Sequence, residues 1–82
     1  PTPRYPRRAQ RRGIQGKVLV SILIGIDGVP YSATISKSSG HEVLDNAALK
    51  AAMEWKFSPA QVNGRPVKST NNQSFVFSLK NR

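Results

Sequence analysis

Residues 17–26, KVLVSILIGI, constrain the fold more than any other stretch of this chain. Successive side chains of a strand point to opposite faces, so a strand here would gather its β-branched residues on one face. Those residues are Val18, Val20, Ile22, Ile24 and Ile26. The opposite face is half apolar, with Leu19, Ser21, Leu23 and Gly25. We therefore expect a central strand whose second face is also partly covered, by Tyr5, Ala9 and Ile14 of the preceding segment.

A second strand is predicted at residues 29–37, VPYSATISK, after a tight turn at Asp27 and Gly28. Its larger side chains alternate with serine and threonine: Tyr31, Ala33 and Ile35. Pro30 lacks an N–H and is tolerated mainly at the edge or the end of a strand. This strand should therefore lie at one edge of the sheet.

The next element is a helix, predicted at residues 41–56. Ser39 and Glu42 have the spacing of a capping box, in which each side chain bonds a free backbone N–H of the first turn. The apolar stripe at helical spacing comprises Leu44, Ala47, Ala48, Ala51 and Trp55. Pro59 ends the helical region, and we expect Trp55, Phe57 and Pro59 to have structural roles.

The last strand is predicted at residues 67–80, after a turn at Asn63 and Gly64 with Pro66. A right-handed crossover can place it beside the first strand and parallel to the second, which gives the order second, first, third. The predicted fold is thus α+β, a ββαβ core with a three-stranded antiparallel or mixed sheet (order 2-1-3) on one main helix. A short N-terminal helix is expected between Pro6 and Gly13.

Residues 71–79, NNQSFVFSL, contain neither proline nor charge, the usual protections of an edge strand against unwanted pairing. Because the other edge is blunted by Pro30, this segment is the open edge of the predicted sheet. Phe75, Phe77 and Leu79 share one face of it. An edge of this kind can accept an added strand through backbone hydrogen bonds.

The charge is concentrated at the N-terminal end. The chain has 82 residues and a net charge of +9, and its first 17 residues carry six bases and no acid. An alternative function is therefore polyanion binding, to nucleic acid or cell-envelope polysaccharide, by this basic segment. We expect no nucleic acid among the partners, because the sheet lacks the interleaved aromatic and basic residues that a nucleic-acid platform requires.

Catalysis and metal binding find little support in the sequence. There is no cysteine, and His41 is the single histidine. His41, Asp45 and Ser38 superficially suggest a nucleophile, a base and an orienting group. A helix start explains these residues better, so we expect neither an enzyme nor a cofactor or metal site.

The motifs together resemble the TonB C-terminal domain family. The most specific pair is Tyr5-Pro6, followed about fifty residues later by Trp55-Lys56-Phe57-Ser58-Pro59. Nearly the whole chain takes part in the resemblance, including Gln15-Gly16-Lys17-Val18, Asp27-Gly28, Ser38-Ser39-Gly40, Leu44-Asp45, Ala48 and Ala52. Prolines 1 and 3 fit the proline-rich spacer that precedes such domains, so we interpret residues 1–4 as the end of the spacer and 5–82 as the domain.

This resemblance implies a periplasmic domain of a protein anchored in the inner membrane of a Gram-negative bacterium. Family members work with ExbB and ExbD and grip the TonB box of outer-membrane receptors for iron-siderophore, haem or cobalamin uptake. The box adds as a strand to the last strand of the domain, and the Tyr-Pro motif lies near the bound receptor. The corresponding residues are Tyr5, Pro6, Asn71, Asn72, Gln73, Ser74, Phe75, Val76, Phe77 and Ser78. Some relatives form homodimers, and a monomer and a dimer both stay open.

Overall fold

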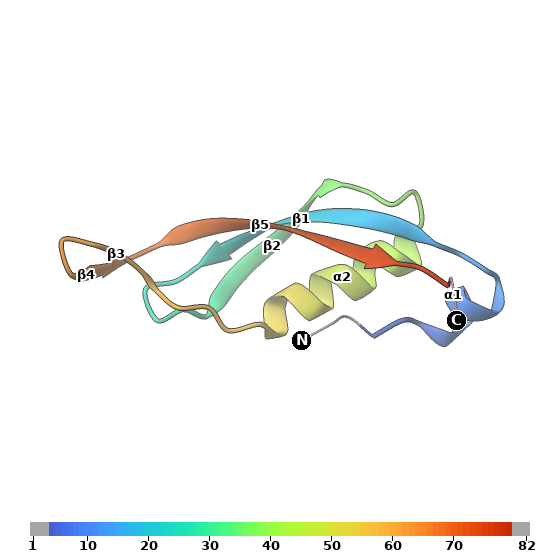
Figure 1. Ribbon diagram of the computed structural model, residues 1–82, viewed down its shortest axis with the longest axis horizontal. Helices are drawn as coiled ribbons and strands as arrows, with labels where there is room; N and C mark the ends of the chain where they lie inside the picture. Colours follow the sequence, from blue (N-terminus) through green and yellow to red (C-terminus); the bar gives the residue numbers. More distant parts are fainter. Residues whose placement is uncertain (1–3, 80–82) are drawn as a thin grey trace.

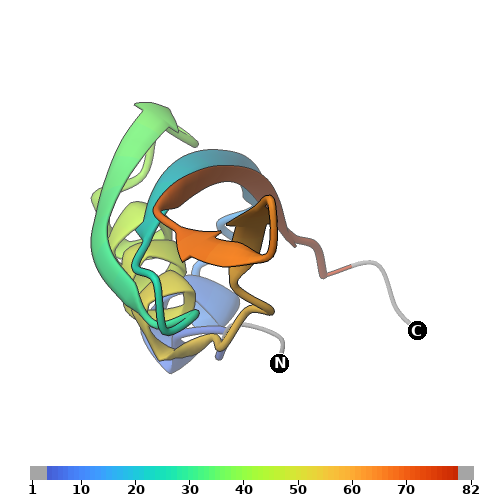
Figure 2. The same cartoon turned by 90° about the vertical axis from the view of Figure 1, so that its left-hand side faces the viewer.

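A three-stranded sheet forms one layer of the domain, with the longer helix along its inner face and a short helix at one end (Figure 1). The computed structural model describes residues 4–79. The central strand β1, Gly16–Ile24, is antiparallel to β2, Pro30–Lys37, and to β5, Ser69–Phe77. The order β2-β1-β5 confirms the predicted sheet, with β2 and β5 at its edges and parallel to each other. Figure 2 shows the sheet curving over the helices.

The core lies between β1 and the main helix α2, Glu42–Glu54. Val18, Val20, Ile22 and Ile24 of β1 are buried, as the alternation predicts, whereas Ile26 lies beyond the strand and is 58% exposed. Three of the four buried residues of α2 are alanines, which lets the helix approach the sheet closely: Leu44, Ala48, Ala51 and Ala52. Among residues 4–79, no helix combines the length and apolarity that crossing a bilayer requires.

The N-terminal arm, which we define as residues 4–14, covers a different face from the one predicted. It contains the expected short helix, α1, Arg7–Arg11, and lies on the same side of the sheet as α2. Ala9 is fully buried in the core, and the Tyr5 ring packs on Phe77 of β5. The arm covers this face because α2 packs chiefly on β1 and β2, which leaves the inner side of β5 to other residues.

The connection between β1 and β2 is wider than the predicted two-residue turn. The N–H of Gly25 donates to the carbonyl of Val29, and Gly28 alone in this loop has a positive φ, at 83°. A bulge follows, because Ile24 pairs with Pro30 and Leu23 pairs with Ser32. Tyr31 is the extra residue, so it is 51% exposed and does not share the orientation of Ala33 and Ile35.

The predicted capping box at the start of α2 is wrong. His41 is the N-cap residue and makes no side-chain cap bond. The Ser39 hydroxyl instead accepts the N–H of His41 at 3.1 Å, and Asp45 accepts the N–H and the hydroxyl of Ser39. Asp45 in the first turn of the helix, and not Glu42, thus bonds the preceding loop.

Two further differences concern the ends of the predicted elements. Helix α2 stops at Glu54, and Trp55 is already extended, with φ −77° and ψ 153°. The start of the predicted last strand belongs to a separate hairpin, β3, Ala60–Val62, with β4, Arg65–Val67. Asn63 and Gly64 have φ values of 53° and 79°, the positive angles of a type I′ hairpin turn. Lys80, the predicted end of the last strand, lies outside the described residues.

Candidate partner-binding edge

Strand β5 is bonded along one side only within the described sheet. It pairs with β1 at nine successive positions, from Gly16 opposite Phe77 to Ile24 opposite Ser69, with no register shift. Its other side has no neighbouring strand among residues 4–79. Residues 71–77 of the segment predicted to be an open edge, 71–79, therefore form one in this fold, and Ser78 and Leu79 follow the end of the strand.

The alternation of backbone directions identifies the groups on that open side. The N–H of Gly25 points to Val29 on the β2 side, so even-numbered residues of β1 point to β5. Their partners, the odd-numbered residues of β5, are bonded in turn to β1. The backbone groups directed outward thus belong to Thr70, Asn72, Ser74 and Val76. In keeping with this, the Ser74 carbonyl is reached only by a weak bond from the neighbouring Gln73 side chain, at 3.4 Å.

The predicted edge residues accordingly fall into two groups. Asn72, Ser74 and Val76 have exposed side chains on the outer face and outward backbone groups. Asn71 and Gln73 are half-buried, and Phe75 and Phe77 are buried in the core, so these four support the strand from its inner face. Ser78 follows the last residue of β5 and is exposed.

Tyr5 lies against the end of this edge strand, and Pro6 follows it in the arm. The Tyr5 hydroxyl donates to the carbonyl of Ile14, and its ring meets Phe77 edge-on at a centroid distance of 5.3 Å. Both Tyr5 and Pro6 are half-buried. The structure therefore brings Tyr5 to β5, although it lies more than sixty positions away in the sequence, whereas Pro6 lines a groove beside α2.

Trp55, Phe57 and Pro59 form the connection that leads from α2 towards the hairpin. The Trp55 ring lies 5.3 Å from Phe75 and 5.9 Å from Phe57, measured between centroids. Its Nε1–H is buried and has no hydrogen-bond acceptor in the described part of the chain. The N–H of Phe57 donates to Gly28. Trp55 thus packs against β5, and Phe57 is tied to the loop between β1 and β2, while the structural role expected for Trp55, Phe57 and Pro59 stays a prediction.

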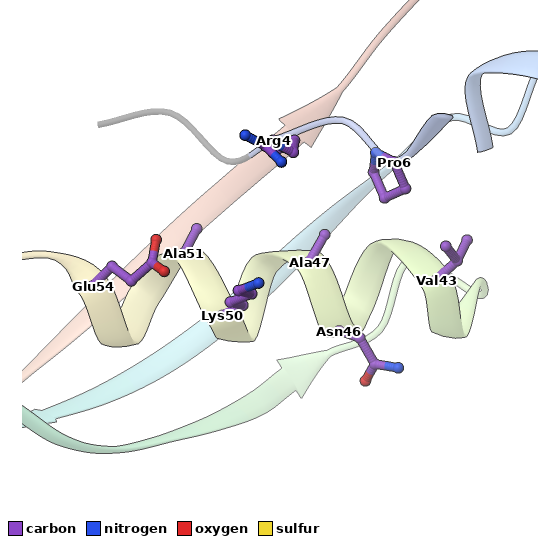
Figure 3. Close-up of a pocket in the computed structure, with 8 residues that line it drawn as sticks. All are labelled: Arg4, Pro6, Val43, Asn46, Ala47, Lys50, Ala51 and Glu54. Carbon is purple, nitrogen blue, oxygen red and sulfur yellow. The ribbon is translucent and has the colours of Figure 1, made fainter. Parts of the chain in front are cut away.

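A groove separates the arm from α2 (Figure 3). Its volume is about 600 Å³, and its lining mixes small apolar and charged side chains: Arg4, Pro6, Val43, Asn46, Ala47, Lys50, Ala51 and Glu54. Residues 4–79 contain no group of three or more histidines, cysteines and acids that could hold a metal ion. The groove was not predicted from the sequence, because it depends on how the arm lies along the helix.

The loop before α2 accounts for the residues that superficially suggested a catalytic triad. The hydroxyl of Ser38 donates to the carboxylate of Asp45, which also accepts from Ser39. Burial acts to raise the pKa of Asp45, but the hydrogen bonds from Ser38 and Ser39, aided by nearby His41, outweigh it and lower the pKa. The carboxylate is thus held in its ionised form as the centre of a structural clasp.

The basic residues of the arm stay at the surface. All five of its arginines are exposed: Arg4, Arg7, Arg8, Arg11 and Arg12. Four of them lie on or next to α1. This helix precedes the first residue of β1, Gly16, which pairs with Phe77 at the end of β5. The edge of β5 itself carries no charge from residue 69 to residue 79.

The fold and its open edge define an α+β domain with an edge strand suited to pairing with another chain. The chain matches the model of the family described as Gram-negative bacterial TonB protein C-terminal over residues 1–79. It belongs to this family, which confirms the resemblance seen in the sequence.

Individual relatives support the same assignment. The chain is 46% identical over 65 residues to Protein TonB of Vibrio cholerae, covering 79% of this chain and 27% of that protein. It is also 46% identical over 61 residues to Protein tonB2 of Pseudomonas aeruginosa, covering 74% of this chain and 23% of the relative. This chain thus spans about a quarter of the length of these relatives.

Solved structures agree with the fold. The solution NMR structure of the Pseudomonas aeruginosa TonB CTD has a TM-score of 0.80 and 32% identity, covering 100% of this chain and 83% of that chain. An NMR structure of the Helicobacter pylori TonB-CTD has a TM-score of 0.74 and 34% identity, covering 96% of this chain and 71% of that one.

Proposed function

We propose that this domain is the receptor-binding part of a TonB-type energy transducer and that it binds the TonB box of outer-membrane receptors by strand addition to β5. The observation that carries the proposal is the open edge of β5, which lacks proline and charge. An added strand would bond to the outward backbone groups of Thr70, Asn72, Ser74 and Val76. Backbone bonds tolerate different side chains, so one edge can serve receptors whose boxes differ in sequence.

The strength of such a complex suits a transient mechanical link. Each added hydrogen bond contributes about 0.5 to 1.5 kcal/mol net. Several bonds along the strand give affinities in the micromolar range, about 8 kcal/mol, which permit release after force has been transmitted. The domain needs no catalytic group for this role, and we propose that it is not an enzyme.

The remainder of the proposal concerns the whole protein. Residues 5–82 would form the periplasmic domain and residues 1–4 the end of a proline-rich spacer. An inner-membrane anchor would lie in the part of the protein outside this chain, where ExbB and ExbD would act. The process served would be uptake of iron-siderophores, haem or cobalamin, and the oligomeric state would be a monomer or a homodimer.

The test is an NMR titration of the ¹⁵N-labelled domain with a TonB-box peptide. We expect the largest shifts at the outward amides of β5, with smaller shifts at Tyr5 beside Phe77. Shifts confined to the arginines of the arm would contradict strand addition. Shifts at the exposed residues of β2, such as Thr34 and Ser36, would place the partner on the wrong edge.

Polyanion binding by the arm is the second candidate, and the exposure of its five arginines favours it. Binding through these charges should weaken as salt rises, because it releases counterions from the polyanion. Fluorescence anisotropy with a labelled single-stranded oligonucleotide and with an anionic polysaccharide tests this function. The absence of salt-dependent association would remove it.

A further inference from the structure

Four arginines lie on one face of the short helix α1. Side chains follow one another at about 100° around a helix, so positions 7, 8, 11 and 12 fall within about 140° of one another. Arg12 is included because it continues the helix with αR geometry. Ala9, which is fully buried, lies on the opposite side. The helix therefore has a cationic face, which we define as Arg7, Arg8, Arg11 and Arg12.

The charges of this cationic face are not neutralised within the described part of the chain. All four guanidinium groups are exposed, and none makes an ion pair or a side-chain hydrogen bond among residues 4–79. Like charges four positions apart repel each other on a helix, so Arg7 with Arg11 and Arg8 with Arg12 destabilise α1. Charges kept at a local cost to stability are typical of functional surfaces, where a ligand of opposite sign offsets the repulsion.

The arm holds the cationic face in a fixed position. Ala9 packs in the core, and the N–H of Ile14 donates to the Ala9 carbonyl at 2.9 Å. The Tyr5 hydroxyl donates to the carbonyl of Ile14, and the Tyr5 ring contacts Phe77. Because these contacts order the backbone of the arm in the free domain, little further ordering is needed when a partner binds.

We propose that the cationic face docks the domain on the phosphate groups of an anionic phospholipid surface. All bases of the arm are arginines, whose planar guanidinium bonds a phosphate through two parallel N–H donors. Clusters of about four to eight bases on a surface helix are typical of proteins that bind anionic lipids. None of the exposed large apolar side chains belongs to the arm, so the docking is peripheral and is driven by charge.

The arm is less well suited to the other polyanions. Proteins that bind single-stranded nucleic acid add aromatic rings, on which the bases stack, to their positive charges. Tyr5 is the one aromatic residue of the arm, and its ring and hydroxyl are engaged by Phe77 and Ile14. A flexible polysaccharide must also be ordered when it binds, which costs entropy. Phospholipid headgroups already lie in one plane, so a fixed face can meet several phosphates at once.

Only one end of the domain would contact the membrane. Helix α1 lies at the end of the molecule opposite the β3–β4 hairpin (Figure 1). The domain is 49 Å long, whereas salt screens the field of a charged surface within about 8 Å at physiological ionic strength. Bases nearer the hairpin therefore contribute little to docking, although they count equally towards the net charge.

Vesicle cosedimentation of the 82-residue chain tests the proposal. We expect binding to vesicles of equimolar phosphatidylcholine and phosphatidylglycerol, and none to phosphatidylcholine alone. Arg8→Gln combined with Arg11→Gln should weaken binding about thirtyfold, since each base near an anionic surface contributes about fivefold. The control, Lys56→Gln combined with Arg65→Gln, removes the same charge from exposed positions beyond α2 and should weaken binding less than about twofold.

Equal weakening by the two double variants would overturn the proposal, because net charge alone would then account for binding. Binding that survives an increase from about 0.1 M to about 1 M salt would contradict docking through charge, since the Debye length shortens from about 10 Å to about 3 Å. Tighter binding of a single-stranded oligonucleotide or of an anionic polysaccharide than of the mixed vesicles, at the same salt concentration, would assign the cationic face to those polyanions instead. The proposal does not depend on strand addition to β5, so a TonB-box peptide titration can fail while vesicle binding holds, and the reverse.

Discussion

The backbone N–H of Phe57 donates a 2.9 Å hydrogen bond to the carbonyl of Gly28. This bond ties the segment after α2 to the loop between β1 and β2, and Trp55 just before it reaches Phe75 of β5. Gly28 has no room for a side chain, since a Cβ there would lie 2.1 Å from the carbonyl oxygen of Phe57. The contact thus fixes the position of the aromatic residues beneath the edge strand.

Replacement of Gly28 by alanine should destabilise the fold strongly. The residue has a φ of 83°, which costs an alanine about 1 to 2 kcal/mol, and the clash with Phe57 should add about 1 to 3 kcal/mol. Gly64→Ala is the matched control, because Gly64 has a φ of 79° with nothing within 4 Å of an added Cβ. Urea unfolding of both variants measures the difference. Equal losses would show that Gly28 is required for its φ alone.

Proline substitutions in β5 should separate the outward backbone groups from the inward ones. Asn72→Pro removes an N–H that points away from β1, so we expect a stability loss below about 1 kcal/mol and loss of peptide binding. Asn71→Pro removes an N–H bonded to β1 opposite Ile22, so the loss of stability should be about 2 kcal/mol or more. Thermal unfolding and calorimetric titration with a TonB-box peptide give the two readouts. Full peptide binding by folded Asn72→Pro would argue against the β5 edge.

The sequence predicted the buried face of β1 because regular alternation depends only on local spacing, and it predicted the sheet order because crossover connections have a preferred hand. It could not predict the bulge at Tyr31. Tyr31, Ala33 and Ile35 alternate with serine and threonine in the sequence whether or not the strand carries an extra residue there. The clasp at Asp45 was missed for a related reason. The capping box pairs residues three positions apart, whereas Asp45 bonds Ser39, six positions earlier in the chain.

The candidate edge was predicted because its lack of charge and proline is a property of the sequence itself. The division of its residues into outward and inward groups required the register with β1. The covering of Phe75 by Trp55 and of Phe77 by Tyr5 joins distant parts of the chain. Asn63 and Gly64 are a local signal for a turn, and such a pair also predicts strands on both sides of it, as β3 and β4 are in this fold.

The clasp around Asp45 should make stability depend on acid. Hydrogen bonds from Ser38 and Ser39 hold the folded-state pKa of Asp45 below its ordinary value of 3.8. A carboxyl whose pKa is lowered by folding stabilises the fold above the unfolded pKa, and this contribution is lost as the pH falls through the folded pKa. Urea midpoints measured from pH 6 down to about pH 2 should fall less steeply for Asp45→Asn than for the unmodified chain. Glu42→Gln, an exposed charge change in the same helix, should leave the slope nearly unaltered.

Trp55 should tolerate replacement by phenylalanine far better than replacement by alanine. Its Nε1–H has no acceptor within the described structure, so Trp55→Phe removes no hydrogen bond and keeps a ring against Phe75 and Phe57. We expect a loss of about 1 kcal/mol for phenylalanine and of about 3 kcal/mol or more for alanine, which leaves a cavity beneath β5. Chemical unfolding measures both losses. Similar losses for the two variants would mean that the indole N–H, and not the packing of the ring, holds Trp55 under the edge strand.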